Sequence, residues 1–395
     1  MSENSKHRKK TNNMDDIKWY HAFYKKRTWI LLLSPISLLI LLIIRNNTYI
    51  AEYVFARGIY RIKSQLVSLL TGIVPFSIME LMILLIPVLG VIFIIRMIDG
   101  LYKSGKKKDG KIKYLLTLYG VNIGCVISIV FFMFMMLGGV NYYRYPFSYS
   151  SGLEVRESSV DELYEVTNYL AMEASSVRTR LHNSGFENDN GVIRYTRSEL
   201  KELGGELRKE YLEASTEYPV FSGHYGKYKP VFFSKFMSRM EITGIFWPFT
   251  GEANVNVHAS DFSIPATIAH EMAHQRGFMR EDEANFIAYM ICKRSDNLQL
   301  QYSGIMLALS YASNQLYKYD SDLYYEVAEN YDEGMLADLR DEYYYWKQFE
   351  DTVISTISTN MNDTYLKANN QSDGVKSYGR MVDLLLAHYR YEQGK

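Results

Sequence analysis

Residues 267–285 read TIAHEMAHQRGFMREDEAN, and this stretch decides how the rest of the chain is interpreted. It contains the motif HExxH, with His270 and His274 four residues apart. Positions four apart lie on one face of a helix, so both imidazoles can bind one Zn²⁺ ion at about 2.0–2.1 Å each. Glu271, beside the first histidine, is expected to reach a water molecule at the metal and to act as general base.

A catalytic zinc site needs three protein ligands and one open position. Glu281, Asp282 and Glu283 follow the motif and compete for the third place. Asp282 is expected to be part of an acidic helix N-terminus that the helix dipole favours. The frame from Glu281 to Asn285 resembles the E-x-x-A-D or E-x-x-A-N signature that supplies the third ligand in several gluzincin families. This resemblance favours Glu281, with Glu283 as the alternative, and Asn285 is expected to orient a ligating histidine.

The return from His274 to Glu281 spans six residues, which is shorter than in most gluzincins. Gly277 lies where metzincins, with HExxHxxGxxH, have a turning glycine, but Arg280 occupies the position of their third histidine. The alternative is a surface helix that carries two histidines and a glutamate by chance. Small residues beside the ligands, a turn residue after the helix and the acidic cluster argue against chance.

The charge of the chain is unevenly distributed, although its 395 residues have a formal net charge of zero. Residues 1–140 carry 19 of the 44 Lys and Arg and 7 of the 44 Asp and Glu, a net of +12. Residues 141–395 carry the other 25 and 37, a net of −12. This asymmetry indicates two environments. The basic residues adjoin apolar segments, so no nucleic-acid partner is expected. Two cysteines provide no disulfide framework.

Three apolar segments predict a multi-pass protein of the cell membrane with the lipid bilayer as partner. They are residues 28–44, 78–95 and 114–140, which together form a transmembrane region over 28–140. The tail of residues 1–27 holds eight Lys and Arg, and the loop of residues 96–113 holds seven. The loop of residues 45–77 is longer and holds four. The positive-inside rule places the amino terminus in the cytoplasm and everything after Val140 outside it.

The segment between the first two spans has apolar residues at helical spacing over Ala51–Leu70. It is expected to form a helix lying on the membrane face. Glu80, near the entrance of the second span, is expected to be stabilised by interfacial solvation or the helix dipole rather than to act in transport.

The acidic remainder predicts a linker over residues 141–157 and a mainly helical domain with a small sheet over 158–395. The predicted helices are about 159–182, 196–215, 264–276, 280–294, 297–317, 321–349, 350–367 and 375–391, and the predicted strands are 229–235, 242–247 and 253–258. Zinc peptidases of the zincin class share this order of an edge strand, the HExxH helix and further helices. In them the strand before the metal helix binds extended substrate, so Glu252 and Asn254 are candidates for substrate contact, with ordinary strand packing as the alternative.

Motifs along nearly the whole chain resemble bacterial membrane proteins catalogued as domain of unknown function family 3810, which are similar to zinc peptidases. The motifs are Pro75–Ser77, Asn141–Arg144, Pro248–Asn256, the HExxH stretch through Asn285, Tyr365–Asn369 and Ser377–Gly379. The resemblance implies a gluzincin-like fold behind three membrane helices.

The sequence therefore predicts a membrane-anchored zinc metallopeptidase, a hydrolase with an extracytoplasmic active site. The alternative is a zincin-like sensor or peptide-binding module that keeps zinc without proteolysis. The abundant tyrosines include an oxyanion-stabilising candidate, but the sequence does not select one. The substrate and the choice between endo- and exopeptidase action stay open.

Overall fold

The computed structural model describes residues 18–182, 184–369, 371 and 380–394, and most of them are helical. The family motif Ser377–Gly379 and the first 17 residues of the basic tail lie outside the described residues. In chain order the elements are η1 Trp19–Tyr24, η2 Lys26–Leu32, α1 Leu33–Arg45, η3 Ile50–Tyr60, α2 Arg61–Gly72, α3 Ile78–Lys107, α4 Ile112–Leu137, η4 Gly139–Tyr143, α5 Phe147–Ser151, α6 Val160–His182, α7 Arg197–Ala214, η5 Pro219–Phe221, β1 Lys229–Pro230, α8 Ser234–Arg239, β2 Gly244–Trp247, β3 Glu252–Val255, η6 Asp261–Ser263, α9 Ile264–Gln275, α10 Glu281–Lys293, α11 Leu298–Tyr319, α12 Ser321–Ala328, α13 Glu333–Lys347, α14 Val353–Ala368 and α15 Met381–Gln393.

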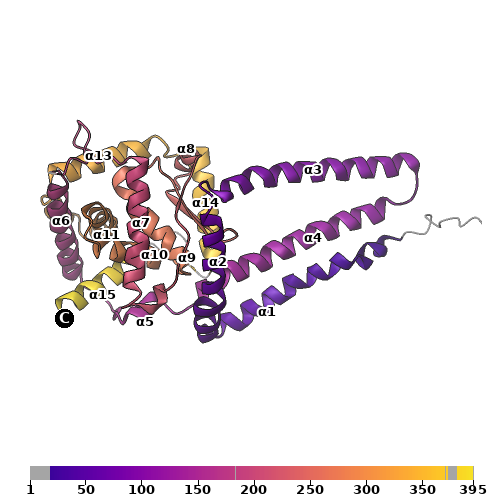
Figure 1. Ribbon diagram of the computed structural model, residues 1–395, viewed down its shortest axis with the longest axis horizontal. Helices are drawn as coiled ribbons and strands as arrows, with labels where there is room; N and C mark the ends of the chain where they lie inside the picture. The colour runs from indigo at the N-terminus through magenta and orange to yellow at the C-terminus, as the bar shows by residue number, and fades with distance from the viewer. Residues whose placement is uncertain (1–17, 183, 370, 372–379, 395) are drawn as a thin grey trace, which may run out of the picture. The chain divides into compact units, whose positions relative to one another are not determined.

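The chain divides into two compact units, Met1–Ile40 with Met82–Met133 and Leu41–Leu81 with Phe134–Lys395. Three helical stretches, Lys26–Arg45, Ile78–Lys107 and Ile112–Leu137, are long and apolar enough to cross a membrane. The prediction of three membrane-spanning helices is confirmed in their number, length and apolar composition. The long helices α3 and α4 are visible in Figure 1.

The third apolar helix ends at Leu137, three residues before the predicted end. Gly138 leaves the helical conformation, and η4 then places Val140, Asn141 and Tyr142 in buried positions. The predicted linker 141–157 is also largely folded into the second unit. Phe147 at the start of α5 is fully buried within its main hydrophobic core.

The core of the second unit is built around α11, which packs against α6, α9 and α10 (Figure 1). Two helices of this unit begin with the predicted capping boxes. Thr196 and Glu199 form the expected capping box at the start of α7. Before α6, the backbone N–H of Ser159 donates to the Glu162 carboxylate, and the backbone N–H of Glu162 donates to the Ser159 hydroxyl. The predicted helix 321–349 is divided into α12 and α13.

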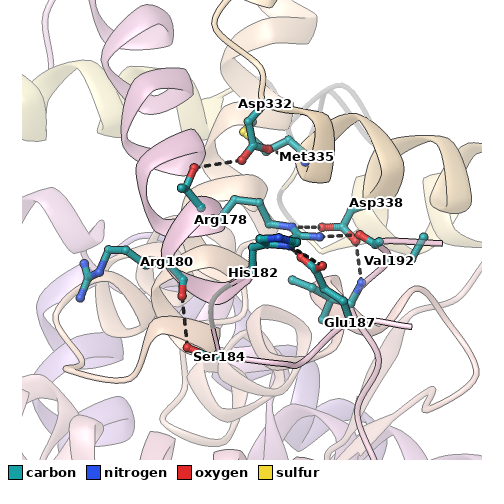
Figure 2. Close-up of polar contacts among 12 residues, drawn as sticks. Arg178, Arg180, His182, Ser184, Glu187, Val192, Asp332, Met335 and Asp338 are labelled. Atoms are coloured by element: carbon teal, nitrogen blue, oxygen red, sulfur yellow. Dashed lines mark hydrogen bonds and ion pairs between the residues drawn. The ribbon is translucent and has the colours of Figure 1, made fainter. Parts of the chain in front are cut away.

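A buried ion-pair network ties α6 to α13 at Arg178, which is fully buried (Figure 2). Its Nε donates to Asp338 at 2.7 Å, and its guanidinium also pairs with Glu187. Asp338 in turn accepts from the backbone N–H of Ile193 and from the hydroxyl of Tyr302, both at 2.9 Å. Because each charge in this network has a partner, we interpret the network as stabilising the packing of α6 against α13.

The sheet of the second unit has three strands in the order β1-β3-β2, so the predicted number of strands is confirmed. β1 is parallel and β2 antiparallel to β3. The predicted strand 229–235 is shorter than expected, because α8 begins at Ser234. β3 is central and all four of its residues are buried, so β2 is the edge strand on the metal-helix side.

The segment between the first two apolar helices packs into the second unit with one face. Ala51, Ala56 and Tyr60 of η3 and Ser64 and Ser68 of α2 are buried. The opposite face is apolar and exposed, with Ile59, Ile62, Leu66 and Leu70. The helices are therefore part of the folded unit, and the contact of their apolar face with a membrane stays a prediction.

Candidate metal centre

The side chains of His270, His274 and Glu281 meet at one point of the second unit. The two histidines come from α9 and Glu281 is the first residue of α10. Nε2 of His270 lies 3.2 Å from one carboxylate oxygen of Glu281, and Nε2 of His274 lies 3.6 Å from the other. One ligand atom from each of the three residues lies within 4.8 Å of the others. The structure thus brings together all three residues that the sequence selects.

The donor set fits a zinc ion in both chemistry and spacing. Ligands at about 2.1 Å from a tetrahedral ion are separated by about 3.4 Å, and the two carboxylate–imidazole distances are 3.2 and 3.6 Å. Two imidazoles and one carboxylate leave a fourth position open, as catalytic zinc sites do. Nδ1 of His270 and Oε2 of Glu271 are buried here without a hydrogen-bond partner among the described residues. Such unsatisfied groups are typical of sites that take a ligand.

A tight turn explains how the six residues between His274 and Glu281 bring Glu281 back to the two histidines. α9 ends at Gln275, and Gly277 adopts a left-handed φ of +88°. A Cβ atom at this position would lie about 3.0 Å from Tyr60 and from Asn141, so the turn also needs the absence of a side chain. Arg280 is extended, and α10 then begins directly with Glu281.

His274 is held in the tautomer that a metal requires. Its Nδ1 lies 2.6 Å from the carbonyl oxygen of Phe278, so Nδ1–H donates and Nε2 keeps its lone pair. Burial lowers the pKa of His274 to about 4, which keeps the ring neutral at physiological pH. Neutral imidazole is the form that binds a metal ion.

The remaining charges favour a cation at this position. Burial opposes ionisation of Glu281, but the two histidines lower the pKa of its carboxyl. Burial likewise opposes protonation of His270, yet its interactions with Glu281, Glu271 and Asn285 raise its pKa. Asn285 therefore lies near His270, and its side-chain amide also donates to the hydroxyl of Tyr311 at 3.0 Å. Its role in orienting a metal ligand stays a prediction. The ionised carboxylate of Glu281 beside two imidazoles favours positive charge between them.

Glu271 lies between the metal ligands and the edge strand β2. Burial raises its pKa to about 8, partly offset by the attraction of His270. A Cβ atom at position 244 would overlap Oε1 of Glu271, so Gly244 allows the carboxylate to lie against the strand backbone. Phe246, two residues on, has its ring centroid 6.2 Å from that of His274. This face of β2 is therefore part of the site, which the sequence did not indicate.

The C-terminal turn of α9 is held by residues far away in the sequence. The hydroxyls of Tyr60 and Ser64 donate to the carbonyl oxygens of His274 and Gln275 at 2.9 and 2.7 Å. Nη1 of Arg144 donates to the carbonyl oxygen of Gly277 at 3.3 Å. These bonds satisfy carbonyl groups that a helix end leaves unpaired. We call Glu52, Tyr60, Ser64 and Arg144 the brace.

Arg144 and Glu52 form the charged centre of the brace. Nε and Nη2 of Arg144 each lie 2.9 Å from the carboxylate of Glu52, and both side chains are almost fully buried. Arg57, which is partly exposed, pairs with the same carboxylate at 2.6 Å. The Arg144 guanidinium also lies 4.2 Å from the ring centroid of Phe278, whose carbonyl orients His274. The brace therefore supports His274, a candidate metal ligand, directly through Tyr60 and indirectly through Arg144 and Phe278.

Three acidic or amide residues that the sequence considered for the site have other contacts. Glu283 accepts from the backbone N–H of Phe147 at 2.7 Å and pairs with Arg280 at 2.5 Å. Glu252 accepts from the N–H groups of Ile78 and Met79 at 3.0 and 2.9 Å. Asn254 accepts from the hydroxyl of Ser77 at 2.6 Å.

The burial of Glu252 and Asn254 favours the alternative of ordinary strand packing over substrate contact. Both belong to the central strand and have 1% and 0% of their surface exposed. Their polar atoms hold residues 77–79, where α3 begins, and Glu80 in turn accepts from the N–H groups of Phe232 and Phe233 at 3.0 and 2.8 Å. These carboxylates anchor the start of an apolar helix to the sheet.

Two of the many tyrosines lie within electrostatic reach of Glu281. Desolvation raises the pKa of both Tyr311 and Tyr365, although the surface of Tyr365 is 43% exposed, and the charge of Glu281 raises each further. The hydroxyl of Tyr365 is 3.0 Å from that of Tyr142. Both phenols stay protonated at physiological pH and can donate a hydrogen bond. The sequence offered no signal for choosing these two.

The comparisons with known proteins identify a family but no function. The family model described as "Protein of unknown function (DUF3810)" matches residues 55–386. No curated protein and no solved structure matches the chain. Because the family model covers most of the sequence, the chain belongs to this family.

Proposed function

We propose that this member of the family is a membrane-anchored zinc metallopeptidase of the zincin class, similar to gluzincins. The observation that carries the proposal is the convergence of three ligand atoms within 4.8 Å, beside a buried glutamate with an unpartnered oxygen. That arrangement has the composition of a hydrolytic zinc site: two imidazoles, one carboxylate and one general base.

In this proposal His270, His274 and Glu281 would hold Zn²⁺, which would supply Lewis-acid chemistry for a substrate carbonyl and a water molecule. Glu271 takes a proton from the attacking water and passes it to the leaving amine. A glutamate whose pKa lies near neutrality suits both steps. Tyr365 and Tyr311 are the candidates for donating a hydrogen bond to the oxyanion.

The outer edge of β2 offers a place for an extended peptide. Asn256 donates its N–H to the carbonyl of Thr243 at 2.8 Å, so these two residues form a hydrogen-bonded pair of the antiparallel ladder. Hydrogen-bonded and non-hydrogen-bonded pairs alternate along such a ladder, so Gly244 and Phe246 belong to non-hydrogen-bonded pairs with β3. The N–H and C=O groups of these two residues therefore point away from β3. No further strand follows β2 in the described sheet. A peptide added antiparallel to this edge would pass its carbonyl groups beside Glu271.

The cellular location follows from the charge distribution. The positive-inside rule supports a cytoplasmic amino terminus and an extracytoplasmic metal domain. A phosphatase reporter fused after residue 150 should be active in cells. An inactive reporter beside an active fusion at the amino-terminal side of the second span would contradict this orientation.

The proposal is tested with Glu271→Gln in the full-length protein. The variant keeps the ligands, so we expect unchanged zinc content and a loss of peptidase activity of about 10²–10⁴-fold. Comparing extracytoplasmic peptides between cells with wild type and variant would reveal the substrates. If the variant retains zinc and every cellular function, the protein is a zinc-containing sensor or peptide-binding module, and the peptidase proposal is wrong.

A further inference from the structure

A cavity of about 240 Å³ has a basic lining that does not include the three candidate metal ligands. Three chain segments line it: α7, the loop after η5 and the residue that follows α9. The lining residues are Gly205, Arg208, Lys209, Leu212, Gly223, His224, Tyr225 and Arg276. Cavities that bury drug-sized ligands have about 300–1,000 Å³, so this one suits a small group.

Arg276 is the buried centre of the cavity wall. Its side chain is 4% exposed, and its guanidinium lies 3.8 Å from the ring centroid of Tyr211 and 4.6 Å from that of Tyr225. Nη1 donates to the carbonyl oxygen of Met272 at 2.9 Å, whereas Nε is buried without a hydrogen-bond partner. Among the described residues no carboxylate pairs with this guanidinium.

The charge of Arg276 is thus not neutralised within the part of the chain that the structure describes. Burial lowers its pKa, and the nearby charge of Arg208 acts in the same direction. Aromatic rings offset only part of the cost of burying a cation. Arg208 has no ion-pair partner in the described residues either, and Lys209 has only an exposed pair with Glu213 at 3.4 Å. The cavity therefore combines two unpaired guanidinium groups with a weakly paired ammonium group.

We infer that this cavity binds a phosphate group. Two guanidinium groups and one ammonium group match the charge and the several acceptor oxygens of phosphate, and a guanidinium stacked between aromatic rings is already oriented for it. Free phosphate and a phospholipid headgroup share this chemistry.

The loop that forms one wall is held by α2. Its residue His224 donates its backbone N–H to Oε1 of Gln65 at 2.8 Å. The opposite face of α2 is apolar and exposed at Ile62, Leu66 and Leu70. A phospholipid headgroup is therefore tested beside free phosphate. The inference does not depend on peptidase activity.

The test uses full-length protein in a sugar-headgroup detergent without phosphate. Inorganic phosphate and dioctanoyl phosphatidylglycerol are titrated separately, with chloride at matched ionic strength and dioctanoylglycerol as the respective controls. We expect a saturable increase in Tm with at least one phosphate-containing probe. Saturation by inorganic phosphate assigns the free ion, and a response to the lipid alone assigns a headgroup; both outcomes support the site.

The variant Arg208→Gln/Lys209→Gln removes two exposed or half-exposed charges without touching the core. It should weaken binding by about tenfold or more, since two charge-assisted contacts are lost. Lys235→Gln/Lys318→Gln carries the same charge change on exposed positions elsewhere and should bind as wild type does. The inference is overturned if neither probe shifts Tm beyond its control, or if both double variants bind equally well.

Discussion

The candidate metal centre and the brace both contain buried charged groups, but the two regions differ in how these groups are paired. In the brace, Glu52 faces Arg144 and Arg57, and its pKa is lowered by these partners despite the cost of burial. In the metal cluster, Glu271 has one oxygen without a partner and burial raises its pKa to about 8. Glu52 is paired at both carboxylate oxygens, whereas the unpartnered oxygen of Glu271 belongs to a residue beside the three candidate ligands.

The partners of the buried glutamates separate those of the candidate site from the others. Glu52, Glu252 and Glu283 are buried as deeply as Glu271, yet each accepts from neighbouring cations or backbone N–H groups. Glu281 instead faces two imidazoles. Burial alone therefore does not separate Glu281 from the other buried glutamates, whereas the identity of its partners does.

Removing the cation of the brace should give the largest effect on stability. Arg144→Met leaves Glu52 buried with only the partly exposed Arg57, so we expect a loss of about 3–5 kcal/mol in unfolding free energy. Chemical unfolding of the full-length protein in detergent measures it. Arg57→Met is the matched control and should cost about 1 kcal/mol. Equal losses in the two variants would show that the buried pair has no special role.

Filling the space beside Glu271 should affect the metal cluster without removing a ligand. A Cβ atom in Gly244→Ala would overlap the carboxylate and displace it. A displacement of about 1 Å costs on the order of 10²-fold in rate, so kcat should fall by about that factor while zinc content stays unchanged. Gly205→Ala on the exposed face of α7, with no atom near its Cβ position, is the control. Wild-type kcat in Gly244→Ala would place the working base elsewhere.

Neutralising Glu252 should separate a structural role from substrate contact. Glu252→Gln weakens its bonds to the N–H groups of Ile78 and Met79, and we expect a loss of about 1–3 kcal/mol in stability. KM and kcat of the folded protein should be unchanged. A rise in KM without a loss of stability would restore the substrate role expected from the sequence.

The sequence selects the three candidate ligands that the structure brings together, because their spacing is local. A helix periodicity places His270 and His274 on one face, and a glycine turn followed by acidic residues predicts the return to Glu281. The apolar helices and the number of strands follow from equally local patterns.

The brace and the edge strand could not be predicted in this way. Tyr60 and His274 are 214 residues apart, and no periodicity connects them. The expectation for Glu252 and Asn254 depended on which strand lies at the sheet edge. Strand order is a property of the tertiary fold, so the strand nearest in sequence to α9 proved to be the central one.

The most direct test of the account is the zinc content of the purified full-length protein, compared with two glutamate variants. We predict one zinc per chain in the wild type, a large loss of zinc in Glu281→Gln, and full retention in Glu283→Gln, because Glu283 is already paired with Arg280. Zinc well below one per chain in the wild type, or equal zinc in both variants, would contradict the metal centre described above.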